Sequence, residues 1–178
     1  PANQLEGAPL EAELWTPADG QWRPAASAAL PRLYHGNAIL LPDATVLTGG
    51  GGLPGPLTNA NVEVYYPPYL YRRDGSGLPA ERPVIDTQPV ARSWGEALEL
   101  PWSGPRAIAR LTLLGTGQAT HAFNPGQRLV ELSFSDDGAV LRTRLPATRG
   151  ELPPGFYLLF ALDRDGVPST GKIVRVAP

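Results

Sequence analysis

The sequence contains no cysteine, no methionine, only two histidines and no long apolar run. Without cysteine, the chain can form no disulfide, no thiolate metal site and no cysteine nucleophile. No stretch approaches the 18 apolar residues of a membrane-spanning helix, so we expect no membrane span. A net charge of −2 argues against nucleic acid as a partner. Because the chain begins Pro1-Ala2-Asn3 without a methionine, we expect a processed product or a piece of a longer protein, with any signal peptide upstream.

Glycine and proline are abundant, with 20 and 21 residues spread between short apolar runs. Many short elements joined by tight turns use these residues in this way. No segment has the periodicity of an amphipathic helix. The sequence therefore predicts an all-β protein.

An internal repeat marks the first part of the chain. Residues 12–17 read Ala-Glu-Leu-Trp-Thr-Pro and residues 62–67 read Val-Glu-Val-Tyr-Tyr-Pro, an offset of 50 residues that matches the kelch propeller period. Between the copies, residues 38–50 predict a strand, a two-residue turn, a strand and a glycine pair. We therefore expect residues 1–80 to form the terminal blade or blades of a kelch-type β-propeller, which need further blades to cover them.

The pattern changes after the polar segment 74–82, where we place the domain boundary. Residues 81–178 have the strand spacing of an immunoglobulin-like β-sandwich. Their expected strands, separated by turn-forming residues, are Ala97–Pro101, Ala107–Leu114, Leu129–Phe134, Val140–Leu145, Gly155–Leu162 and Lys172–Val176. Residues 156–160 are expected to form a buried central strand.

The two histidines, His35 and His121, are the candidate metal ligands. Histidines so far apart in a sequence are more often a surface ring and a turn residue than two ligands of one metal. However, His35 follows Tyr34 directly, and His121 lies in a Gly/Thr-rich loop of the kind that carries ligands. Neighbouring strand residues point to opposite faces, so Tyr34 and His35 can meet one metal only if the chain bends there. Such nitrogen and oxygen donors would suit Cu(II).

Two other motifs favour turns over ligand sites. Gly50, Gly52 and Gly55 satisfy G-x-G-x-x-G, but prolines follow, and the helix that a dinucleotide site requires is not expected. The segment Asp163-x-Asp165-Gly166 is reminiscent of a calcium loop but lacks the distal glutamate, so we expect a hairpin turn.

Several strings together resemble the galactose oxidase and glyoxal oxidase family of copper-radical oxidases. In family order they are residues 32–35 (Arg-Leu-Tyr-His), 40–43, 49–52, 63–70, 82–83, 119–121 with Asn124 and 127–128, 152–157 and 166–169. These matches cover almost the whole chain, and their combination is specific. Gly36 stands where galactose oxidase has a serine, so substrate preference is not carried over.

The resemblance implies roles for three residues. Tyr34 would be the axial tyrosine at copper and the general base that takes the substrate hydroxyl proton, and His35 and His121 would be the imidazole ligands. His121 would come from a loop of the immunoglobulin-like, early-set domain that reaches the propeller centre. The family's radical resides on a tyrosine linked to a cysteine in earlier blades, so this cofactor cannot form within a chain that lacks cysteine.

The resemblance also implies a function. The parent protein would oxidise a primary alcohol or an aldehyde, a carbohydrate among them, while reducing O2 to H2O2, outside the cell or in its envelope. The remaining N-terminal blades would be its partners, and this chain alone would be inactive. The alternative is a non-catalytic kelch and immunoglobulin-like module that binds a glycan or a protein, because propellers also serve as scaffolds.

Overall fold

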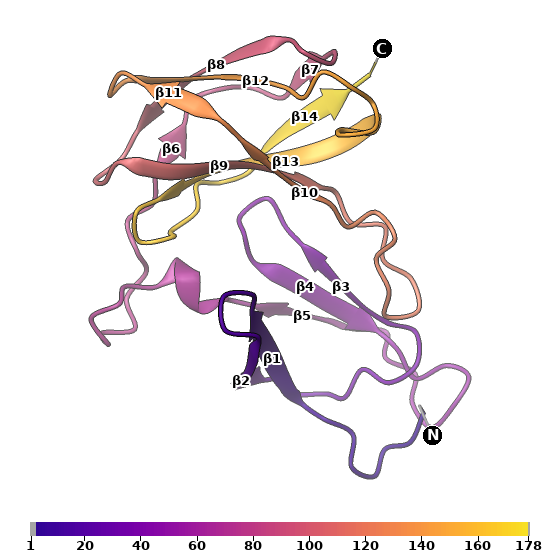
Figure 1. Cartoon of the computed structure of the whole chain (residues 1–178). Coiled ribbons are helices and arrows are strands. Elements are labelled where there is room, and N and C mark those ends of the chain that lie inside the picture. Colours follow the sequence, from indigo (N-terminus) through magenta and orange to yellow (C-terminus); the bar gives the residue numbers. More distant parts are fainter. Residues whose placement is uncertain (1–2, 178) are drawn as a thin grey trace. The chain divides into compact units, whose positions relative to one another are not determined.

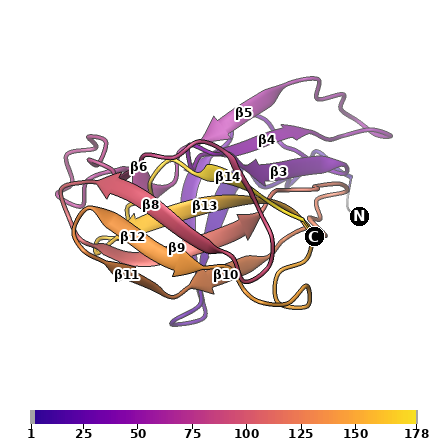
Figure 2. The ribbon, with the colours of Figure 1, turned by 90° about the horizontal axis from the view of Figure 1, so that it is seen from above.

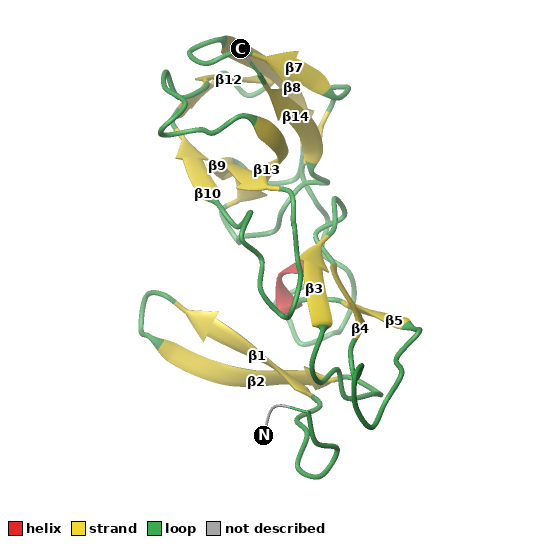
Figure 3. Cartoon of the chain, turned by 90° about the vertical axis from the view of Figure 1, so that its right-hand side faces the viewer, coloured by secondary structure: helices red, strands yellow, loops and turns green. Residues whose placement is uncertain are grey.

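The computed structural model describes residues 3–177, whose regular elements are strands and one short 3-10 turn, η1 (Pro68–Leu70) (Figure 3). The strands are β1 (Glu11–Thr16), β2 (Gln21–Ser27), β3 (Gly36–Leu40), β4 (Val46–Gly50), β5 (Val62–Tyr65), β6 (Val84–Ile85), β7 (Val90–Arg92), β8 (Ala97–Ser103), β9 (Ile108–Gly115), β10 (Leu129–Leu132), β11 (Phe134–Asp136), β12 (Val140–Arg144), β13 (Gly155–Asp163) and β14 (Lys172–Val176). The expected all-β fold is confirmed. Among the described residues, no helix is long and apolar enough to cross a membrane.

The described residues group into two compact units. Unit 1 contains the described residues up to Ile39, together with Val46–Tyr65 and Ala119–Asn124, and unit 2 contains the rest. Each unit is assembled from several separate segments of the sequence, so the grouping differs from a single division between residues 80 and 81. Leu70 belongs to unit 2 because it is buried against Leu158 and Phe160 of β13.

Unit 2 contains two sheets that share one core. The first sheet has the strand order β10-β9-β13-β14-β7, in which only the β14–β7 pair is parallel, and the second has the order β11-β12-β8-β6. Figures 1 and 2 show these sheets as two layers. Their strands alternate between buried and exposed residues, as in β8, where Leu98 and Leu100 are buried while Glu99 is exposed. These inward side chains pack against those of β9 and β12, which makes the unit a β-sandwich.

The central strand β13 is buried on both faces. Tyr157, Leu159 and Ala161 belong to the sandwich core, whereas Leu158 and Phe160 pack on the opposite face with Ala44 and Leu70. This confirms the central strand expected at residues 156–160, except that Phe156 is exposed. The hydroxyl of Tyr157 donates to the Pro153 carbonyl at 2.7 Å, which resembles the tyrosine corner of immunoglobulin-like sandwiches.

The structure corrects two local expectations. The strand expected at Leu129–Phe134 is divided at Ser133 into β10 and β11, which belong to different sheets because the chain crosses between layers there. The β3–β4 connection is a three-residue loop, since the Leu41 N–H donates to the Thr45 carbonyl at 2.8 Å. Ala44 in this loop has a positive φ of 67°, as in hairpins that close a type I turn with a left-handed residue.

Unit 1 contains two small sheets. Strands β1 and β2 form an antiparallel pair, and β3, β4 and β5 form a separate three-stranded sheet. Both copies of the sequence repeat form strands, namely β1 and β5. Trp15 and Trp22 face each other across the β1–β2 pair and are 52% and 64% exposed. A two-stranded sheet of this kind can bury few of its own apolar side chains.

Candidate metal centre

Three aromatic side chains of unit 1 meet although they come from distant parts of the sequence. The ring centroids of His35 and His121 are 4.2 Å apart, those of Tyr34 and His35 are 3.9 Å apart, and those of Tyr34 and His121 are 5.8 Å apart. Two imidazoles that bind one metal through nitrogen at about 2 Å would place their centroids about 4–6 Å apart. The three residues expected from the sequence to form a site therefore lie side by side in unit 1.

The Tyr34–His35 segment is a turn that ends where β3 begins. Leu33 and His35 have positive φ values of 40° and 67°, a region that residues with a Cβ rarely adopt. A sharp bend of this kind allows the adjacent Tyr34 and His35 side chains to face the same region. Unusual backbone conformations of this kind cluster at functional sites.

Backbone and side-chain hydrogen bonds hold this turn in place. The Gly52 N–H donates to the Tyr34 carbonyl at 2.7 Å, and the Asn37 side-chain amide donates to the His35 carbonyl at 3.1 Å. Just upstream, the Asn59 amide donates to the Pro31 carbonyl at 2.8 Å. The turn is thus fixed by the segment that follows β4 as well as by its own strand.

The glycine run explains how that segment comes so close. A Cβ on Gly51 would overlap the carbonyl oxygen of Arg32, and Gly51 also has a φ of 98°. A Cβ on Gly36 would lie 2.9 Å from both the Cβ and the carbonyl oxygen of Arg32. No helix begins after Gly55. The run instead allows the backbone to pass against the turn that carries Tyr34 and His35.

An ion pair supports the same turn from β5. The guanidinium of Arg32 binds the carboxylate of Glu63 and donates to the Asn61 side-chain oxygen at 2.6 Å. Both partners of the ion pair are partly buried. A hydrogen bond from the Ala29 N–H, and then the bond from Arg32, hold the pKa of Glu63 below its usual value. Glu63 lies in the sequence repeat, but its pairing with Arg32 has no sequence signal.

His121 is presented by a tight turn. Thr120 and Phe123 exchange two backbone hydrogen bonds of 2.8 Å, and the two residues they enclose, His121 and Ala122, have φ values of 54° and 59°. Residues 119–124 group with unit 1, while the strands that flank the loop, β9 and β10, belong to unit 2. The loop thus brings the second histidine to the first.

The ring hydrogen bonds leave the same nitrogen of each histidine for a ligand. Nδ1 of His35 lies 2.6 Å from the Leu53 carbonyl oxygen, and Nδ1 of His121 lies 2.7 Å from the Thr120 hydroxyl. Metal-binding histidines commonly use one ring nitrogen for the metal and the other for such a partner. With the phenol of Tyr34, the donors are two imidazole nitrogens and one phenolic oxygen, a set that fits copper.

Carboxylates and thiolates do not add to this donor set. Within residues 3–177, no three His, Cys, Asp or Glu side chains come together in the manner of a metal site. The three rings can be predicted from the sequence, whereas Thr120 and the Leu53 carbonyl cannot. A neighbouring hydroxyl and a main-chain oxygen have no pattern that would single them out.

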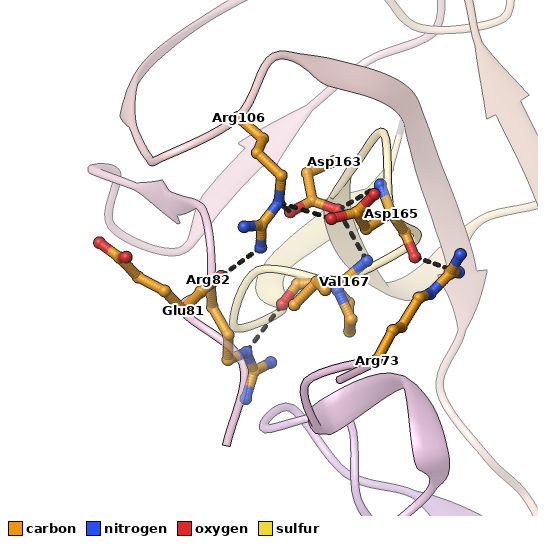
Figure 4. Close-up of polar contacts among 8 residues, drawn as sticks. Arg73, Glu81, Arg82, Arg106, Asp163, Asp165 and Val167 are labelled. Carbon is orange, nitrogen blue, oxygen red and sulfur yellow. Dashed lines mark hydrogen bonds and ion pairs between the residues drawn. The ribbon is translucent and has the colours of Figure 1, made fainter. Parts of the chain in front are cut away.

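The Asp163–Gly166 segment is a turn with its acidic groups already engaged (Figure 4). One oxygen of Asp163 accepts hydrogen bonds from the Asp165 and Val167 N–H groups at 2.9 Å, and the other accepts from Arg106 at 2.7 Å. The Asp163 side chain is fully buried. Leu162 and Pro168 pair across this turn, which confirms the expected hairpin.

Comparisons with known proteins agree with these observations. The family described as "Galactose oxidase-like, Early set domain" matches residues 82–176. A galactose oxidase of Gibberella zeae is 31% identical over 92% of this chain and 24% of its own length. The aldehyde oxidase GLOX of Vitis pseudoreticulata is 34% identical over 84% of this chain and 31% of its own length.

A solved structure is also similar. A fungal alcohol oxidase of the AA5 family, in complex with copper, has a TM-score of 0.86 and 33% identity over 95% of this chain and 36% of that one. The chain thus spans about a quarter to a third of the length of these relatives. On this evidence the chain belongs to the galactose oxidase-like, early set domain family.

Proposed function

We propose that the chain is the C-terminal portion of a copper-radical oxidase that converts a primary alcohol or an aldehyde to its oxidised product while O2 becomes H2O2. The observation that carries this proposal is the meeting of Tyr34, His35 and His121 within one compact unit. The relatives named as galactose, aldehyde and alcohol oxidases support the same chemistry.

Each of the three side chains has a role in this proposal. The Nε2 atoms of His35 and His121 would hold copper, which supplies one-electron redox chemistry when bound. Tyr34 is 41% exposed, so a small substrate can reach it. Its phenolic oxygen would accept the proton of the substrate hydroxyl as general base. The upstream part of the parent would contribute the tyrosyl radical, which would supply the hydrogen-abstracting chemistry.

We further propose that residues 1–80 form the terminal part of a kelch propeller and residues 81–178 the immunoglobulin-like domain. The 50-residue repeat and the strands it forms support the propeller. The remaining N-terminal blades would cover the exposed Trp15 and Trp22. Their absence from the chain, together with the lack of a cysteine, leads us to expect no turnover by these 178 residues alone. The parent would act outside the cell or in its envelope, as the family resemblance implies.

The experiment compares the 178-residue chain with a longer polypeptide that includes the preceding blades, both loaded with copper. Peroxide formation from a primary alcohol and from an aldehyde is measured with a coupled peroxidase. We expect peroxide from the longer polypeptide and none from the 178 residues. Peroxide formation that survives His121→Ala would contradict the ligand assignment.

The second candidate function is a non-catalytic module that binds a glycan or a protein. The lack of cysteine in this chain favours it, because the radical cofactor then depends wholly on upstream residues. The upstream sequence separates the two candidates. A cysteine and a tyrosine at the radical positions of the earlier blades support the oxidase, and their absence supports the binding module.

A further inference from the structure

The loop that presents His121 adopts a conformation that its residues do not favour. Two residues with positive φ, enclosed by a pair of backbone hydrogen bonds, are the signature of a type I′ turn. Asn-Gly is the usual sequence of such turns, because each central residue must adopt a left-handed conformation. Here both positions, His121 and Ala122, carry a Cβ. The turn fixes the direction in which the His121 side chain leaves the backbone.

The backbone does not by itself fix the imidazole ring. Rotation about the two side-chain bonds would still move the ring nitrogens, and both His121 and Thr120 are exposed to solvent. Among the described residues, the hydrogen bond that restricts the ring joins its Nδ1 to the Thr120 hydroxyl at 2.7 Å. The ring also lies edge-on to those of His35 and Tyr34, with centroids 4.2 and 5.8 Å away.

The two histidines differ in how their tautomers are set. The Leu53 carbonyl can only accept a hydrogen bond, so Nδ1 of His35 must carry the proton, and Nε2 is left with a free lone pair. A hydroxyl can donate or accept, so Thr120 is compatible with either tautomer of His121. Only when Thr120 accepts from Nδ1 is Nε2 of His121 available to a metal.

We propose that Thr120 is a positioning residue for His121. Its hydroxyl accepts the Nδ1 proton, holds the ring in the orientation in which it approaches His35, and leaves Nε2 as the ligand atom. This inference rests on the proposed function, in which His121 is a copper ligand. It adds a residue that acts through the histidine and does not itself touch metal or substrate.

The test uses the Thr120→Val and Thr120→Ser variants of the 178-residue chain. Valine keeps the branched shape at Cβ and removes the hydroxyl, whereas serine keeps the hydroxyl. Cu(II) affinity is measured by competition with a chelator, and the nitrogen ligation is followed by EPR. We expect Thr120→Val to weaken copper binding about 10- to 100-fold, as is typical when a partner of a metal-binding histidine is lost. Thr120→Ser should restore the wild-type affinity.

A second measurement needs no metal. The 15N NMR shifts of the two imidazoles report their tautomers, and we expect Thr120→Val to lower the Nδ1–H population of His121 only. His35, whose proton is held by the Leu53 carbonyl, is the internal control. Thermal unfolding followed by circular dichroism verifies that the variants remain folded.

The outcomes separate this inference from the proposed function. If His121→Ala binds copper as tightly as the wild type, the ligand assignment is wrong, and the NMR measurement alone then decides the role of Thr120. If His121 is a ligand but Thr120→Val retains both the wild-type affinity and the wild-type shifts, the positioning role is overturned.

Discussion

The carbonyl oxygen of Arg32 occupies the space that a Cβ on Gly51 would need. The two residues are neighbours because the segment after β4 packs against the turn that carries Tyr34 and His35. Gly52, the next residue, donates its N–H to the Tyr34 carbonyl at 2.7 Å. The position of the Tyr34–His35 turn therefore depends on a residue without a side chain at position 51.

Gly51→Ala is expected to displace the Arg32 carbonyl and with it the Tyr34–His35 turn. Overlaps that force a backbone shift typically cost about 1–3 kcal/mol. We expect a loss of stability of that size, measured by urea unfolding, together with weaker Cu(II) binding.

The matched control is Gly20→Ala. Gly20 also has a positive φ, 65°, but no atom lies within 4 Å of a Cβ built there. Gly20→Ala therefore carries the cost of placing a Cβ on a residue with positive φ, but the new Cβ overlaps no other atom. Equal effects of the two substitutions on copper binding would contradict the role assigned to Gly51.

Arg82→Ala is expected to destabilise unit 2 strongly. The Arg82 guanidinium donates to the carbonyls of Asp43, Pro168 and Ser169 at 2.7–2.8 Å and so joins the β3–β4 loop to the β13–β14 connection. Burial lowers the pKa of Arg82, but opposite charge and three acceptors keep it protonated near neutral pH. Unsatisfied buried carbonyls cost about 1–3 kcal/mol each, so we expect a loss of about 2–4 kcal/mol in chemical unfolding.

Arg142→Ala provides the comparison for that measurement. Arg142 pairs with Glu99 and Asp137, but all three side chains are largely exposed. Exposed ion pairs contribute little because solvent screens them. A loss for Arg142→Ala as large as that for Arg82→Ala would show that charge, and not the hydrogen bonds to the three carbonyls, determines the effect.

Asp137 should add acid-sensitive stability to the β11–β12 hairpin. Hydrogen bonds from Arg142, and then from the Ala139 and Val140 N–H groups, lower the pKa of Asp137 to about 2. A group whose pKa is lowered in the folded state stabilises it above its unfolded pKa of about 4, and this contribution is lost as the pH falls toward 2. Because the Asp137 and Arg142 side chains are both exposed, we expect the wild type to melt only slightly above Asp137→Asn at pH 7.

That difference in melting temperature should shrink between pH 4 and pH 2. Differential scanning calorimetry at several pH values measures it directly. A difference that stays constant down to pH 2 would mean that the charge of Asp137 does not contribute.

Tyr157→Phe tests the hydroxyl at the start of β13. Tyr157 is buried, and burial raises its pKa, so the hydroxyl remains protonated and donates to the Pro153 carbonyl. Removing one such bond while keeping the ring typically costs about 1 kcal/mol. We expect a decrease of that size in urea unfolding, with Tyr66→Phe, at an exposed position, near the wild type. An unchanged stability for Tyr157→Phe would show that its hydrogen bond is replaced by water.

Much of the fold could be predicted because the pattern of each strand is local. The alternation of Leu98, Glu99 and Leu100 indicates a strand with one buried face, and the structure confirms it. The short strands β6 and β7 were missed, because two or three residues are too few to show a period. The division at Ser133 was missed because a continuous strand pattern does not reveal a change of sheet.

The sequence by itself determined the strand pattern, the Tyr34-His35 pair and the resemblance that singled out His121. Only the tertiary structure decided that the two imidazoles meet, because this requires a left-handed turn at the end of a long loop. It also decided which groups hold the rings. The Leu53 carbonyl and the Thr120 hydroxyl become ring partners only after folding, since a hydrogen bond depends on where the chain returns in space and not on residue type.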